Sequence, residues 1–146
     1  MSALVIDCPT GLAGDMLLSA VLDLGVPESV VHEPLHALGL AKAYGLNVEE
    51  SQSGGLRGLR LSVSSEEANP PHRRWLDLRA LISQASLSPS LKTKVLQVFQ
   101  ALADAEATVH GCAPDQVHFH EIGAIDSLVD VIGVCAGIEN LAPESI

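Results

Sequence analysis

One stretch decides how the chain is expected to fold: Val117-His118-Phe119-His120-Glu121-Ile122-Gly123-Ala124-Ile125-Asp126-Ser127-Leu128-Val129-Asp130. His118 and His120 are two residues apart, so an extended backbone places both side chains on one face. Asp126 and Asp130 are four apart, so a helix stacks both on one side. A glycine between the two pairs supplies a turn. The stretch therefore predicts a strand, a turn and a helix that aim four polar groups at one place.

The side chains of this stretch also indicate a chemistry. Imidazole and carboxylate groups suit divalent nickel, zinc, iron or manganese as ligands, so the stretch is a candidate for metal binding or acid–base catalysis. The alternative is that the histidines are ordinary core or surface residues and that Asp126 or Ser127 only caps the helix. In an ideal strand Glu121 points away from both histidines, so it joins them only if the chain bends there.

A second candidate site lies at the start of the chain, in Asp7-Cys8-Pro9-Thr10-Gly11-Leu12-Ala13-Gly14-Asp15-Met16. This glycine-bearing loop joins a predicted buried strand to a helix, which is where ligands often bind in such folds. Free N–H groups at a helix start attract anions, but the two aspartates favour phosphate bridged by a divalent cation. Gly11 and Gly14 are the candidate cofactor-binding residues. The alternative is a tight connection with Asp15 as N-cap.

Two further groups of basic residues and histidines are weaker candidates for a binding site. His72, Arg73 and Arg74 are the densest basic spot in an acidic chain and could hold a phosphate or carboxylate, although a solvated helix start explains them too. His32 and His36 are four apart on a predicted helix and form a possible chelate pair, which we interpret as surface residues.

Periodicity and turn residues predict the elements. The apolar run at residues 3–7 predicts a buried strand, followed by helices from residue 15 to about 24 and over 27–38. Alternating residues at 44–50 and 59–63, separated by a glycine turn, predict a hairpin that pairs with the first strand. Further helices are expected over 75–84, from Pro89 to Gly111 and over 126–140. The expected fold is α+β (mixed α/β), with a small sheet of about three strands covered by five to six helices.

Composition narrows the class of protein. The 146 residues suit one domain, residues 1–146, and a net charge of −10 with 3% aromatic residues argues against nucleic-acid binding. The three cysteines show no paired spacing, which argues against a disulfide framework or a structural zinc knuckle. We see no signal peptide and no apolar run long enough for a membrane span, so the cytoplasm is the expected compartment.

The two long motifs, about a hundred residues apart, resemble the N-terminal region of the LarC family of nickel insertion proteins, and His72-Arg73-Arg74-Trp75-Leu76-Asp77 resembles the motif between them. The resemblance covers most of the chain. It implies a CTP-dependent nickel chelatase, a cyclometallase of the lyase class. Such an enzyme inserts nickel into pyridinium-3,5-bisthiocarboxylic acid mononucleotide, with one carbon–nickel and two sulfur–nickel bonds, during synthesis of the nickel-pincer cofactor of lactate racemase.

The resemblance also implies roles for individual residues. Nickel would be held by His118, His120 and Glu121, with Asp126 as a further ligand. Asp7 and Asp15 would lie close by, as further ligands or as acceptors that orient the imidazoles. Metallation of a ring carbon must remove a proton, so a base is needed beside the metal; Glu121 is the first candidate and Asp15 is also expected to be catalytic. The nucleotide substrate would lie near Gly11, Gly14, His72 and Arg73.

Family members are usually much longer than this chain. We therefore expect it to be the N-terminal domain of a longer or split protein whose C-terminal region binds CTP with Mg or Mn. That region is its expected partner, and a homo-oligomer is possible. Two other functions remain open: a metal-dependent phosphoester hydrolase that uses Asp7, Asp15 and the histidines, and a non-catalytic interaction domain with structural histidines.

Overall fold

A computed structural model describes residues 2–68, 73–119 and 124–146 of the protein. Its elements, in chain order, are α1 (Gly14–Asp23), α2 (Glu28–Ala37), β1 (Tyr44–Ser53), β2 (Leu56–Ser65), β3 (Arg73–Arg74), α3 (Trp75–Gln84), α4 (Pro89–His110), the 3-10 turn η1 (Pro114–Gln116), β4 (His118–Phe119) and α5 (Ile125–Leu141). The expected α+β class is confirmed.

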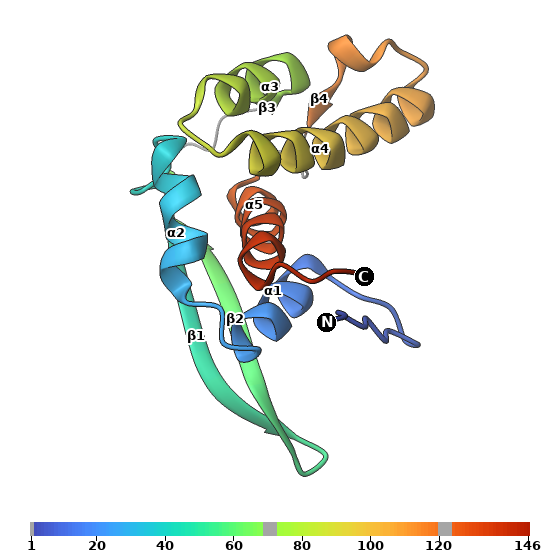
Figure 1. The fold of residues 1–146 in the computed structure, drawn as a ribbon. Coiled ribbons are helices and arrows are strands. Elements are labelled where there is room, and N and C mark those ends of the chain that lie inside the picture. The colour runs from blue at the N-terminus through green and yellow to red at the C-terminus, as the bar shows by residue number, and fades with distance from the viewer. Residues whose placement is uncertain (1, 69–72, 120–123) are drawn as a thin grey trace.

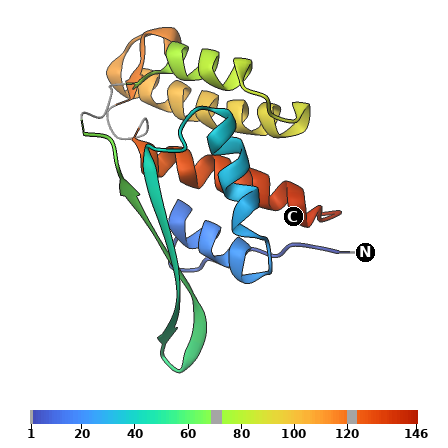
Figure 2. The same ribbon diagram turned by 90° about the vertical axis from the view of Figure 1, so that its left-hand side faces the viewer.

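Helix α5 is the centre of the molecule. It contacts α1, α2, α4 and β2, and in both views it lies between the α3–α4 pair and the half of the molecule that holds α1 and the hairpin (Figures 1 and 2). Gly133 and Gly137 let α1 approach closely, because a Cβ on Gly137 would lie only 2.3 Å from Val21 Cγ1. The buried side chains of these elements belong to one continuous, mainly aliphatic core.

The long hairpin of β1 and β2 packs one face on this core. A two-residue turn at Gly54 and Gly55, both with positive φ, pairs Ser53 with Leu56 and fixes the register. With that register the apolar residues of both strands fall on the same face, where Leu61 is only 5% exposed. The tip extends beyond the helices (Figure 1).

The layer formed by α3 and α4 has a core of its own aromatic residues. Trp75, Phe99 and Phe119 are each about 1% exposed or less and their rings contact in sequence. Helix α4 begins and ends as predicted: Ser88 Oγ accepts a hydrogen bond from Leu91 N–H, and Gly111 ends the helix in the left-handed conformation.

The prediction for residues 3–7 was wrong. They form no strand beside the hairpin; Val5 is 83% exposed, and the segment is bridged instead to the C-terminal residues, through Ala3 and Ser145. The described strands form two separate two-stranded sheets, β1–β2 and β3–β4, instead of one sheet of three strands. The second sheet is two residues long, too short to leave a periodic signal in the sequence.

Candidate functional site: a carboxylate-lined cavity

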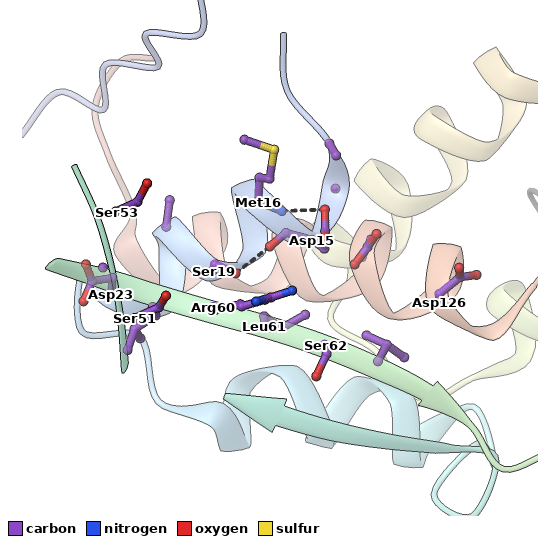
Figure 3. A pocket seen from close by; sticks show the side chains of 17 residues that line it. Asp15, Met16, Ser19, Asp23, Ser51, Ser53, Arg60, Leu61, Ser62 and Asp126 are labelled. Atoms are coloured by element: carbon purple, nitrogen blue, oxygen red, sulfur yellow. Dashed lines mark hydrogen bonds between the residues drawn. The ribbon is translucent and has the colours of Figure 1, made fainter. Parts of the chain in front are cut away.

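A cavity of about 940 Å³ lies between α1, β2 and the start of α5 (Figure 3). One wall is helix α1 from Gly14 to Asp23, and the opposite wall is strand β2 from Gly58 to Val63. Asp126 of α5 lies at one end of the cavity and Asp23, Ser51 and Ser53 lie toward the other end, with Asp15 between them (Figure 3). Asp130 of α5 also lines the cavity. The walls are therefore polar as well as apolar, as in sites that bind polar ligands.

The two sequence motifs meet at this cavity. Gly14, from the first motif, is packed so tightly against Asp130, from the second, that a Cβ on Gly14 would lie 2.6 Å from Asp130 Oδ2 and 2.7 Å from its Cβ. Only glycine permits this approach of α1 to α5. Asp15 and Asp126 occupy the second position of their respective helices, so both carboxylates stand at positive helix ends.

Neither aspartate is an N-cap, which corrects both capping alternatives. The N-caps are Ala13 and Ala124, and neither helix start receives a side-chain cap. Instead Asp15 Oδ1 accepts from Met16 N–H and Asp126 Oδ1 accepts from Ser127 N–H, each at 2.8 Å.

Asp130 has an unusual environment for a carboxylate. Its Oδ1 is buried and has no hydrogen-bond partner among the described residues. Burial, together with the negative charges of Asp15 and Asp126, raises the pKa of Asp130 from its ordinary value to about 6. A buried acceptor without a partner is rare, so this atom marks a place where a proton, cation or polar ligand group would be favourable.

The far end of the cavity is fixed by ion pairs. Arg57 contacts Asp23 Oδ1 at 2.7 Å through Nη1 and Glu50 Oε2 at 3.0 Å through Nε, which ties the hairpin to the C-terminal end of α1. Arg60 contributes a positive charge to the cavity wall beside Ser62 (Figure 3). The cavity therefore combines carboxylates from α1 and α5 with a guanidinium on its β2 wall.

The structure places the other predicted residues elsewhere. Asp7 is exposed, and Gly11 sits in a turn closed by its N–H and the carbonyl of Cys8 at 3.1 Å; neither lines the cavity. His118 is exposed on β4, opposite Arg74. Arg73 pairs with Glu67.

His72, His120 and Glu121 lie outside the described residues. In residues 2–68, 73–119 and 124–146, no three His, Cys, Asp or Glu side chains are arranged to hold one metal ion. The nickel ligand set therefore stays a prediction.

Sequence reasoning missed the hairpin's contribution to the site. Arg60, Ser62 and Asp23 were not singled out, because nothing local in the sequence shows that β2 lies along α1. Asp130 was recognised only as the helical neighbour of Asp126. The glycine at position 14 was the one available signal of close packing at this point.

The fold and the site together define an α+β protein whose two sequence motifs meet at a carboxylate-lined cavity. The family model described as "Nickel insertion protein" matches residues 4–146, so the chain belongs to that family. The chain is 42% identical over 146 residues to a protein of Synechococcus sp. (strain JA-3-3Ab) and 42% identical over 147 residues to one of Geobacter metallireducens. Both relatives carry nickel insertion in their names, and each is matched over 100% of this chain.

The chain spans only 37% of the length of each of these two relatives. No solved structure matches it. Among the described residues, none of the helices combines the length and apolar character needed to cross a membrane.

Proposed function

We propose that this chain is the part of a nickel insertion protein that holds nickel and the organic acceptor together during insertion. The observation that carries the proposal is the meeting of the two motifs at one cavity, through the contact of Gly14 with Asp130. Family membership supports nickel as the metal. The acceptor we propose is pyridinium-3,5-bisthiocarboxylic acid mononucleotide, whose positive ring suits the carboxylates and whose phosphate suits Arg60.

Asp15 and Asp126 are the cavity residues best placed to attract a divalent cation. Their carboxylates come from two helices that line the cavity and add negative charge to a site that already holds Asp130. We assign the remaining nickel ligands to His118, His120 and Glu121, with Asp7 as a further carboxylate. His118 and Asp7 do not line the cavity in this structure, so on this proposal they approach it when nickel binds. Imidazole and carboxylate together suit nickel, whereas carboxylates alone would favour magnesium or manganese.

Insertion into a ring carbon releases the proton of that carbon as the carbon–nickel bond forms, so a base must stand beside the acceptor. Glu121 remains the candidate from the sequence. Asp130 is a second candidate, supported by its buried Oδ1, which has no hydrogen-bond partner within the described part of the chain and lies beside the cavity. The two assignments differ in a testable way, because replacing Asp130 should lower the rate of insertion while leaving nickel binding nearly intact.

We assign CTP, with Mg or Mn, to the region by which the longer relatives exceed this chain. On this proposal the chain alone binds nickel, while complete turnover needs that second region as a partner. An acidic chain of this kind would work in the cytoplasm, where the nucleotide is available.

The test is calorimetric titration of the chelator-stripped chain with nickel, with zinc and magnesium as comparators. We expect saturable nickel binding that is weakened at least about tenfold by Asp126→Asn and by the His118→Ala, His120→Ala pair, since each removes a ligand. Asp104→Asn is the matched control: it removes an exposed carboxylate on α4 that accepts a hydrogen bond from Gln100 Nε2 and lies outside the cavity. Unchanged nickel affinity in the folded Asp126 and histidine variants would contradict the proposal.

A further inference from the structure

Helix α2 carries a second group of metal-ligating side chains, on the surface and outside the cavity. The run His32-Glu33-Pro34-Leu35-His36 places two histidines four residues apart, the spacing at which helical zinc sites present two imidazoles on one face. The structure confirms the shared face: the ring centroids of His32 and His36 are 5.8 Å apart and the ring planes differ by 35°. Glu28 lies one turn earlier on the same helix.

One of the two rings is already held in place. His32 Nδ1 lies 2.6 Å from the hydroxyl of Tyr44, a residue only 7% exposed at the start of β1. A neutral imidazole has one N–H and one lone pair. When the Nδ1–H donates to the tyrosine oxygen, the lone pair is on Nε2, the nitrogen on the outer side of the ring. A ligating histidine is usually oriented in this way by a partner on its other nitrogen.

In that tautomer the nitrogen that carries the lone pair is the one nearer the third side chain. His32 Nε2 lies 3.9 Å from Glu28 Oε2, and the two side chains are 33% and 55% exposed. Two atoms bound to the same metal at about 2.0–2.2 Å approach closer than this, and an exposed glutamate can change rotamer to do so. His36 is exposed and equally free to turn. In the described arrangement the three groups are not yet closed around one ion, so the site forms on binding.

We propose that His32, His36 and Glu28 form a surface site on α2 for a divalent transition metal such as nickel, completed by water and positioned by Tyr44. Two imidazoles and one carboxylate are a donor set that favours nickel, copper or zinc over magnesium and calcium. Because the site lies outside the residues that line the cavity, it is a second metal site, independent of the one proposed there.

The test is a nickel titration of the whole chain, stripped of metal, that counts the equivalents bound. We expect His36→Ala to remove about one equivalent, because one anchored imidazole on an exposed helix cannot hold the ion alone. Tyr44→Phe, which keeps the ring and removes the hydroxyl, should weaken the same equivalent roughly tenfold. His110→Ala is the matched control, since His110 also pairs with a glutamate four residues earlier, Glu106, but is the only histidine of helix α4.

Imidazole proton signals identify the residues. Paramagnetic nickel should broaden the His32 and His36 ring signals in the natural chain, and His36→Ala should abolish the broadening at His32. The same number of nickel equivalents in His36→Ala as in the natural chain would overturn the proposal. Different variants test the cavity proposal, because Asp126→Asn weakens nickel binding in the cavity and leaves the equivalent on α2 in place.

Discussion

A single carboxylate gives the cavity its most distinctive property. Asp130 is a helical neighbour of Asp126, yet only Asp130 has an oxygen that is buried and unpaired among the described residues. The difference arises from Gly14, whose missing Cβ lets the α1 backbone cover Asp130. Such an oxygen is costly in the folded state unless a proton or ligand joins it. We therefore expect Asp130 to be a residue that serves function at a cost in stability.

Replacing Asp130 with Asn should stabilise the chain at neutral pH. The pKa of Asp130 in the folded protein, about 6, is above its ordinary value of 3.8, so between these values the folded state binds the proton more tightly than the unfolded state. The natural carboxylate therefore lowers the free energy of unfolding as pH rises from about 4 to 6, and the full penalty remains above pH 6. Asp130→Asn should remove this decline.

Urea unfolding in the presence of a chelator, at pH 4, 5, 6 and 7.5, measures the effect. We expect the gain in the Asp130→Asn variant to be largest at pH 7.5 and to vanish near pH 4. Asp104→Asn serves as control for the loss of one negative charge. A gain that is equal at every pH would show that the carboxylate is not the cause.

At the scale of elements, the packing of α1 on α5 depends on glycines. Gly14→Ala should destabilise the chain by roughly 1–3 kcal/mol, because the added Cβ overlaps Asp130 and the helices must separate. Alanine is otherwise the better helix former, so propensity alone predicts the opposite sign. Gly58→Ala is the control: it lines the same cavity, and a Cβ there meets nothing within 4 Å. The melting temperatures of both variants show whether the steric clash or the helix propensity of alanine has the larger effect.

Elements with local signals were predictable from the sequence. Helices α3 and α4 were predicted with nearly correct bounds, and Ser88, Pro89 and Gly111 mark the ends of α4. The hairpin and its Gly54-Gly55 turn were also predicted, but each strand extends three residues closer to the turn than expected. The strand predicted over residues 3–7 was wrong for the opposite reason. Their apolar composition favours a strand, but whether a strand forms depends on a partner, and the hairpin they were expected to join leaves them exposed.

At the scale of the whole molecule, the candidate site was only half predictable. The sequence contained both motifs that meet at the cavity, and it identified Asp15 and Asp126. It could not show that β2 forms the opposite wall, because the contact of β2 with α1 joins segments about forty residues apart without any local mark. The part of the site supplied by Arg60 and Ser62 is therefore a tertiary result.

The continuous core predicts cooperative unfolding of the chain. Trp75 reports on the layer of α3 and α4, Tyr44 on the hairpin and α2, and circular dichroism on all helices. Because α5 contacts both halves, we expect all three signals to give one coincident urea transition. A tryptophan transition separated from the other two would instead show that the chain unfolds as two units, contrary to the expectation of a single domain.

The pairing of the two chain ends has a consequence for connectivity. Leu4 N–H donates to Ser145 O at 2.9 Å and Glu144 N–H donates to Ser2 O at 2.8 Å, so the first and last described segments run side by side. In topological terms the chain is nearly a closed ring. A short linker across that junction, with new ends opened at the Gly54-Gly55 turn, would leave every helix–helix contact intact. The order of the helices along the chain can thus change without a change in how the helices pack.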